Sequence, residues 1–100
     1  KAFLKFLPPL LCLAFMAACA TGWTFYKKGQ EYSEEEKWDE AVAQYQEALK
    51  KNPKNLSFQK ELRKARMEAA EAHYKKGEKL LKDGNYDQAL LEYQTSLSFE

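Results

Sequence analysis

The residues best suited to covalent chemistry in this sequence are two cysteines, Cys12 and Cys19. A thiolate is a strong nucleophile near neutral pH, so a cysteine can become the attachment point for another group. Cys19 directly follows Met16-Ala17-Ala18, and small residues at such a place are typical of a cleavage site. Two cysteines are too few for a disulfide scaffold, and with a single histidine they provide no zinc-binding set. The pattern therefore favours modification of Cys19.

The rest of the sequence holds no recognisable catalytic or cofactor-binding motif. No serine lies in a nucleophile-elbow pattern, and the four glycines are isolated rather than gathered in a phosphate-binding loop. His73 is the only histidine, and its position on an apolar helix face indicates a packing residue. We therefore expect no enzyme activity, no metal ion and no cofactor.

The charges of the chain are nearly balanced. Sixteen Lys and Arg residues stand against 15 Asp and Glu residues, which gives a formal net charge of +1 and no electrostatic footprint for nucleic acid. The basic cluster Arg63-Lys64-Arg66 is interleaved with Glu61 and Glu68, so we expect a helix face with salt bridges there. Glu, Lys, Ala and Leu are abundant, whereas Val occurs once and Ile is absent, and this composition favours helices.

Residues 1–18 have the features of a secretory signal peptide. Lys1 and Lys5 form a basic start, and an apolar run follows from Phe6 to Ala20. This run has 15 residues and contains Pro8-Pro9, whereas a membrane-spanning helix needs about 20 residues. We therefore expect a signal-peptide helix over residues 1–18 that is cleaved from the mature chain.

The junction before Cys19 resembles the lipobox of bacterial lipoproteins, with Met16 where that family usually has Leu. The resemblance implies that Cys19 carries the lipid and becomes the first mature residue, followed by a linker over residues 19–22. Ala20, in place of the Asp that retains such proteins in the inner membrane, implies the periplasmic face of the outer membrane. The alternative is an ordinary signal peptide that leaves Cys19 as a free thiol.

The remainder of the chain repeats itself, and the second copy follows the first at a spacing of 48. When Phe25–Leu49 is aligned with His73–Leu97, nine of 25 positions are identical. The identical pairs are Tyr26/Tyr74, Lys27/Lys75, Lys28/Lys76, Gly29/Gly77, Asp39/Asp87, Ala41/Ala89, Tyr45/Tyr93, Gln46/Gln94 and Leu49/Leu97. Each copy predicts two helices, with a turn near Glu36-Lys37 in the first copy and at Asp83-Gly84-Asn85 in the second.

Small residues in each copy indicate a close contact between its two helices. We expect Gly29 to face Ala41 and Gly77 to face Ala89, with Tyr45 or Tyr93 filling the space beside each pair. This pattern resembles the tetratricopeptide repeat, a helix–turn–helix unit of about 34 residues. The resemblance implies an all-α fold with repeats over residues 23–55 and 70–100, although His73 and Ser96 depart from the family's usual residue types.

The 14 residues between the two repeats, 56–69, contain no Gly or Pro. We expect them to extend the first helix of the second repeat into one long helix, near Asn55 to Asp83. Fourteen residues make nearly four helical turns, so the apolar face continues along this helix. Its N-terminal half should overhang the second hairpin and pack on the first repeat.

The resemblance also implies a concave surface that binds protein or peptide partners. The family's partner-binding positions that we assign here are Tyr26, Gln30, Ser33, Tyr74 and Glu78. The alternative for Tyr26 and Tyr74 is packing against neighbouring helices.

The order of lipobox, first repeat, long helix and second repeat resembles the N-terminal region of secretin-family proteins of type II secretion and type IV pilus systems. We therefore expect the N-terminal piece of a longer protein that binds a partner in an envelope complex and can form oligomers. The last helix should then expose Leu90, Leu97 or Phe99 where a further repeat would stack. The alternative function is a lipid-anchored spacer or oligomerisation arm.

Overall fold

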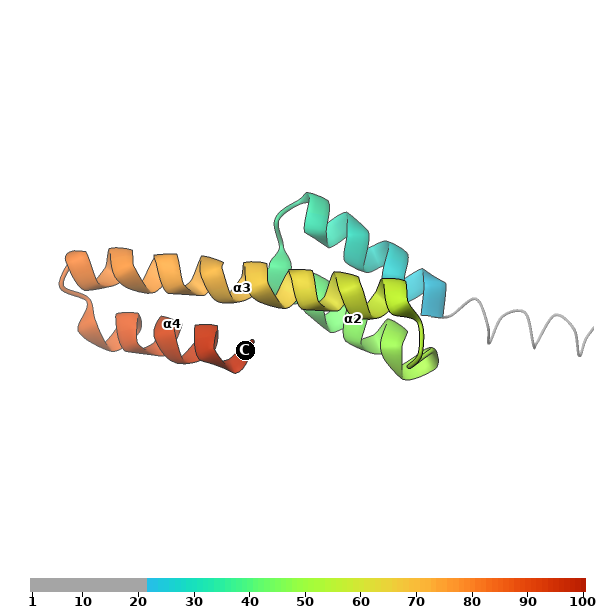
Figure 1. Ribbon diagram of the computed structural model, residues 1–100. Helices are drawn as coiled ribbons and strands as arrows, with labels where there is room; N and C mark the ends of the chain where they lie inside the picture. Colours follow the sequence, from blue (N-terminus) through green and yellow to red (C-terminus); the bar gives the residue numbers. More distant parts are fainter. Residues whose placement is uncertain (1–21) are drawn as a thin grey trace, which may run out of the picture.

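Four helices make up residues 22–100, the part of the chain that the computed structural model describes (Figure 1). The first helix covers residues 22–34, and α2 (Trp38–Lys51), α3 (Leu56–Lys82) and α4 (Tyr86–Ser98) follow. The described residues contain no strand. The predicted all-α fold with one long connecting helix is confirmed, whereas the signal-peptide helix and Cys19 lie outside the described residues.

The long helix α3 is shared by two groups of helices. Its N-terminal half lies beside α2 and the helix over residues 22–34, and its C-terminal half lies beside α4 (Figure 1). With 27 residues at about 1.5 Å each, α3 is about 40 Å long. The described chain is therefore a three-helix unit and a helical hairpin that have one helix in common.

The ends of α3 match those that the sequence predicts. The side chain of Asn55 caps the helix, because its Oδ1 accepts a hydrogen bond of 3.1 Å from the backbone N–H of Phe58. Asp83 is the C-terminal cap, and Gly84 follows it with a φ of 82°. No proline lies between these caps, and Gly77 is accommodated within the helix, so the two halves of α3 are continuous.

The turns that close the two hairpins have the same hydrogen-bond geometry. The N–H of Lys37 donates to the carbonyl of Tyr32, and the N–H of Asn85 donates to that of Leu80, both at 2.9 Å. Each bond runs from an N–H to the carbonyl five residues earlier, as in a Schellman motif. This motif requires a left-handed backbone conformation at the residue just before the donor. Gly84 fills that place in the second turn, whereas the first turn has Glu36 there with a φ of 59°.

Replacing Glu36 by Gly is expected to stabilise the protein by about 0.5 kcal/mol. The left-handed conformation costs a residue with a Cβ roughly 1–2 kcal/mol, which glycine would avoid. The extra freedom that glycine gives the unfolded chain offsets only about 0.4–1 kcal/mol of this gain. Gly84→Ala should have the opposite effect, because a Cβ there meets no atom within 4 Å and adds backbone strain alone. Urea denaturation measures both changes, and a loss of stability in Glu36→Gly would contradict the assignment.

The hydrophobic core lies beneath the N-terminal half of α3. Ala41, Val42 and Tyr45 of α2 pack there against Ala65 and Ala69 of α3, and each of the five is at most 4% exposed. The second hairpin has fewer buried positions, among them Gly77 of α3 and Ala89 and Ser96 of α4. Packing is therefore concentrated in the three-helix unit.

Two glycines, Gly29 and Gly77, lie directly against tyrosine rings of the following helices. A Cβ on Gly29 would lie 2.5 Å from Cε1 of Tyr45, and a Cβ on Gly77 would lie 2.8 Å from Cε1 of Tyr93. The three atoms nearest to each glycine's Cβ position belong to the tyrosine ring that we expect beside it, and Ala41 and Ala89 are buried, at 0% and 1% exposure. Each glycine makes room for a tyrosine ring from the next helix. The ring is bulkier than a methyl group and reaches further across the contact.

Candidate functional site

No metal site and no membrane-spanning helix occurs in the described part of the chain. Within residues 22–100, no three His, Cys, Asp or Glu side chains are grouped so that they could hold a metal ion. None of the helices there is both long enough and apolar enough to cross a bilayer. The features described below are helix surfaces and the polar groups that lie between helices.

The concave-face residues of the first repeat are largely taken up by internal packing. The ring of Tyr26 stacks on Phe58 of α3 at 4.9 Å between centroids, and Trp23 meets the same ring edge-on at 4.9 Å. Phe58 itself is completely buried. The hydroxyl of Ser33 lies 3.2 Å from that of Tyr45. Tyr26 therefore follows the packing alternative, and α3 covers the face on which it lies.

The corresponding residues of the second repeat are open to solvent. Tyr74 is 50% exposed, and its ring lies 5.5 Å from that of Tyr93. The carboxylate of Glu78 accepts a hydrogen bond from Tyr74 and thereby raises the pKa of the Tyr74 hydroxyl. Glu78 is exposed, as is Gln30 in the first repeat. The structure thus separates the predicted binding residues into a covered set, Tyr26 and Ser33, and an exposed set.

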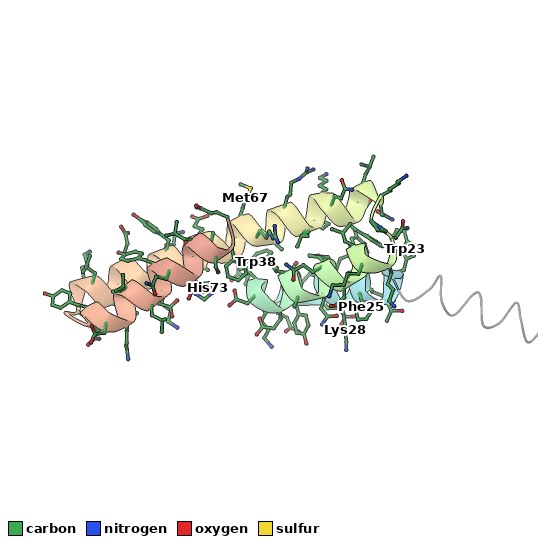
Figure 2. All side chains as sticks on the ribbon, turned by 90° about the horizontal axis from the view of Figure 1, so that it is seen from below. Trp23, Phe25, Lys28, Trp38, Met67 and His73 are labelled. Carbon is green, nitrogen blue, oxygen red and sulfur yellow. The ribbon has the colours of Figure 1, made fainter. Side chains whose placement is uncertain are left out.

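A groove between α3 and α4 lies beside Tyr74 and encloses about 530 Å³. The lining residues are Arg63, Arg66, Met67, Ala70, Glu71, Tyr74, Ser96, Phe99 and Glu100. Figure 2 shows the Met67 side chain projecting from α3 on the side away from α2 and the first helix. Of these residues, sequence reasoning assigned only Tyr74 to binding. The repeat spacing of 48 could have indicated the groove, because it relates residues that line the groove to residues that surround Phe58 in the first repeat.

The outer face of α4 also exposes large apolar side chains. Leu90 is 58% exposed and Leu97 is 66% exposed, as the sequence predicts for that face. Phe99 differs from this expectation, because its ring stacks on the imidazole of His73 at 5.7 Å between centroids and is partly buried. Tyr86 is 68% exposed, whereas its counterpart Trp38 packs against the core.

Basic side chains on α3 lack the salt bridges that the sequence predicts. Within the described residues, Arg63, Lys64 and Arg66 form no ion pair, whereas Glu71 pairs with Lys75 one turn along the helix at 3.0 Å. The prediction of paired charges around Arg63 was wrong because these long side chains extend into solvent, where an ion pair stabilises too little to fix them. The guanidinium groups of Arg63 and Arg66 are therefore available beside the groove.

His73 links the two hairpins through two carboxylates. Its Nδ1 lies 2.6 Å from Oε2 of Glu92 on α4, and its Nε2 lies 2.8 Å from Oδ2 of Asp39 on α2. Figure 2 shows His73 near the junction of the two hairpins. The prediction that His73 is a packing residue was incomplete: its ring packs on Phe99, but both of its nitrogens make polar contacts across helices.

The geometry around His73 favours the charged imidazolium. Both ring nitrogens face carboxylate acceptors, and both can donate only when the ring is protonated. Partial burial lowers the pKa of His73, but the hydrogen bonds to Glu92 and Asp39 outweigh it and raise the pKa above its ordinary value of 6.5. The hydrogen bond from His73, helped by Lys76, lowers the pKa of Glu92.

Stability is expected to fall as the pH rises from about 6 to about 8.5, by a few tenths to about 1 kcal/mol. A raised pKa in the folded state means that the His73 contribution is complete below pH 6.5 and disappears as the pH rises through the folded pKa. Because the chain has one histidine, His73→Gln should remove the difference between the two pH values. Urea denaturation of both proteins at each pH measures it. An equal pH dependence in the variant would contradict the linkage.

A comparison with protein families supports the prediction that the chain contains helical repeats. The family model described as tetratricopeptide repeat matches residues 26–98, which include both hairpins and the whole of α3. No curated protein and no solved structure is significantly similar to the chain.

Proposed function

Because the chain belongs to the tetratricopeptide repeat family, we propose that residues 22–100 form a non-catalytic scaffold that binds another protein. Repeats of this family generally mediate protein–protein interaction and are typically not enzymes. The observation that carries the proposal is the difference between the hairpins. The first has its apolar face covered by α3, whereas the second has an open groove and an α4 with exposed leucines. Exposed apolar surface of this kind marks interaction sites.

The finer part of the proposal concerns the membrane. We propose that Cys19 carries a lipid that anchors the module to the periplasmic face of the outer membrane. Support comes from the small residues before Cys19, the apolar segment before them and the absence of any later cysteine in the sequence. Two or three acyl chains would give a firm anchor, whereas one chain would give a marginal one.

The mass of the protein extracted from membranes tests the anchor. We expect a chain that starts at Cys19 and carries the added mass of acyl groups. Cys19→Ser provides the matched variant and should be recovered with residues 1–18 still attached or without a lipid. An unmodified chain starting at Cys19 in the wild-type protein would contradict lipidation.

We further propose that the module is the N-terminal part of a secretin-type protein and that its partner belongs to a secretion or pilus-assembly complex. The support is the order of segments: a lipobox-like junction, one repeat, a long helix and a second repeat. This assignment predicts a protein partner in the cell envelope and no nucleic-acid partner.

The second candidate function is a structural spacer or an oligomerisation arm. The observation that favours it is α3, which joins the two hairpins as one continuous helix of 27 residues. A spacer needs no accessible binding surface, so the two functions differ at the open face of the second hairpin.

Photo-crosslinking in cells distinguishes the two functions. A photoreactive amino acid is placed at position 74, on the open face, and in a control variant at position 43, which is exposed on α2. The scaffold predicts adducts with a different protein from position 74 only. Adducts of twice the monomer mass would favour the oligomerisation arm, and the absence of adducts from either position would favour the spacer.

A further inference from the structure

The charges of the three-helix unit are segregated along its sequence. Every charged residue in the segments 22–30 and 48–60 is a lysine, and these are Lys27, Lys28, Lys50, Lys51, Lys54 and Lys60. Residues 31–40, around the first turn, contain six acidic residues and one lysine. The near-neutral total of the chain therefore conceals one strongly basic region and one strongly acidic region.

The fold brings the two lysine segments together at one end of the unit. The start of the first helix lies against the end of α2, because a Cβ on Gly22 would lie 3.3 Å from Cβ of Lys51 and 3.6 Å from the carbonyl oxygen of Ala48. The same helix lies against the start of α3, where the ring of Trp23 meets that of Phe58 at 4.9 Å. The connection from α2 to α3 closes this end (Figure 1). We call residues 22–30 and 48–60 the basic end.

The positive charge of the basic end is largely uncompensated. All six of its lysines are exposed. Lys50 pairs with Glu47 at 2.9 Å, and the other five form no ion pair within residues 22–100. A surface that gathers charge of one sign attracts ligands of the opposite sign. The basic end is therefore suited to an anionic partner.

Two large apolar side chains lie exposed among these lysines. Trp23 is 53% exposed although its ring touches those of Tyr26 and Phe58, and Leu56 is 77% exposed. Figure 2 shows Trp23 at the end of the molecule opposite to the second hairpin. Tryptophan favours the headgroup layer of a bilayer, and lysine can lie there with its charge among the headgroups. The combination is typical of a surface that contacts a membrane.

The sequence before the basic end indicates which anionic partner is near it. The apolar run from Phe6 to Ala20 ends two residues before Gly22. Cys19, to which we assign the lipid, precedes Gly22 by three residues, so at most about 11 Å of extended chain separates them. A protein held in a bilayer at Cys19 must therefore keep its basic end close to the headgroups.

We propose that the basic end is a membrane-contact surface, at which the lysines bind anionic phospholipid headgroups and Trp23 and Leu56 enter the interfacial layer. The inference goes beyond the protein-binding function, and it uses the proposed lipid at Cys19 only as the reason that a bilayer is near. Because α3 begins at the basic end, this contact directs the second hairpin away from the bilayer.

Vesicle binding without acyl chains tests the surface. The chain from residue 19 onward is prepared with Cys19→Ser, so that no lipid can be attached, and it has 14 basic and 15 acidic side chains. We expect it to sediment with vesicles of phosphatidylglycerol and phosphatidylcholine in equal parts, but not with phosphatidylcholine alone. Salt at about 0.5 M should release it, because the Debye length falls to about 4 Å. A chain of this balance has no net attraction to anionic vesicles, so binding would come from the segregated lysines.

Two matched variants locate the binding. Lys51→Glu with Lys54→Glu should weaken binding at least tenfold, because each lysine near an anionic surface contributes a factor of about five. Lys79→Glu with Lys82→Glu is the control, because these lysines are also exposed and three residues apart but lie at the other end of α3. Both double changes alter the net charge equally, and the control should bind as the unchanged chain does. Circular dichroism checks that both variants keep their helices.

Two spectroscopic measurements report the contact directly. Trp38→Phe leaves Trp23 as the only tryptophan, and its emission should shift to shorter wavelength with the anionic vesicles but not with the neutral ones. Lipids with paramagnetic headgroups should broaden the amide signals of Lys54 and Leu56 and leave those of Gly84 and Asn85 unchanged.

Three results would overturn the inference. The first is failure to sediment with anionic vesicles, or equal sedimentation with neutral ones. The second is an equal loss in the two double variants, which would make net charge alone responsible. The third is binding of soluble polyglutamate through Lys51 and Lys54 while vesicles leave the Trp23 emission unchanged, which would make an acidic protein the partner. The mass of the membrane-extracted protein and the crosslinks from position 74 do not depend on these measurements, so the proposed anchor and scaffold are tested separately.

Discussion

Phe58→Ala is expected to produce the largest loss of stability of any single truncation in the described chain. Phe58 is fully buried and touches the rings of Trp23 and Tyr26, so its removal leaves a cavity between three helices. Such truncations cost about 3–5 kcal/mol, against a total of about 5–15 kcal/mol for a small domain. We expect α3 to lose its attachment to the first hairpin in much of the population.

The emission of Trp23 and the circular dichroism signal in urea measure this loss, because Trp23 contacts Phe58 directly and both report unfolding of the same unit. Leu56→Ala is the control. Leu56 lies half a turn away on the same helix but is 77% exposed, so its truncation should change stability by less than about 0.5 kcal/mol. Equal effects of the two changes would show that the burial of Phe58 contributes little to the stability of the fold.

Gly29→Ala is expected to have the second largest effect, a loss of about 2 kcal/mol through overpacking of the core. A methyl group at Gly29 would lie within 3.0 Å of three ring carbons of Tyr45. The Tyr45 ring is 1% exposed and its hydroxyl is close to that of Ser33, so it has nowhere to move. Overpacking a core costs about 1–3 kcal/mol, which exceeds the gain of about 1 kcal/mol that alanine has over glycine within a helix.

The same change at Gly77 should cost clearly less, although the two glycines are equivalent in sequence. The nearest approach is 2.8 Å rather than 2.5 Å, and the partner Tyr93 is only partly buried, so its ring can shift toward solvent. Lys28→Ala and Lys79→Ala, near the two glycines and exposed, control for general effects on the helices. Thermal or urea denaturation ranks the four variants. A larger loss for Gly77→Ala than for Gly29→Ala would contradict this account.

The features of the fold that local signals specify could be predicted from the sequence. Asn55 and Gly84 mark the ends of the long helix because capping and left-handed turns depend on neighbouring residues. The repeat spacing of 48 then placed Gly29 and Gly77 at corresponding positions. These features need no knowledge of how the helices are arranged in space.

The features that were missed depend on contacts between distant segments. His73 meets Asp39, which is 34 residues away, only because the first turn of α2 and the middle of α3 lie side by side. No local pattern gives that register. The partial burial of Tyr26 likewise depends on the ring of Phe58, which is 32 residues away and stacks on it.

The continuity of α3 gives the two hairpins a mechanical relation. A flexible linker would let each hairpin turn independently, but a helix shared by both transmits rotation as a lever does. With an arm of about 40 Å, a tilt of about 10° at the Phe58 end would carry the turn at Gly84 through about 7 Å. The ion pairs of His73 lie near the middle of that arm and join it to both neighbours. A force that tilts the Phe58 end of α3 would therefore displace the second hairpin as a whole.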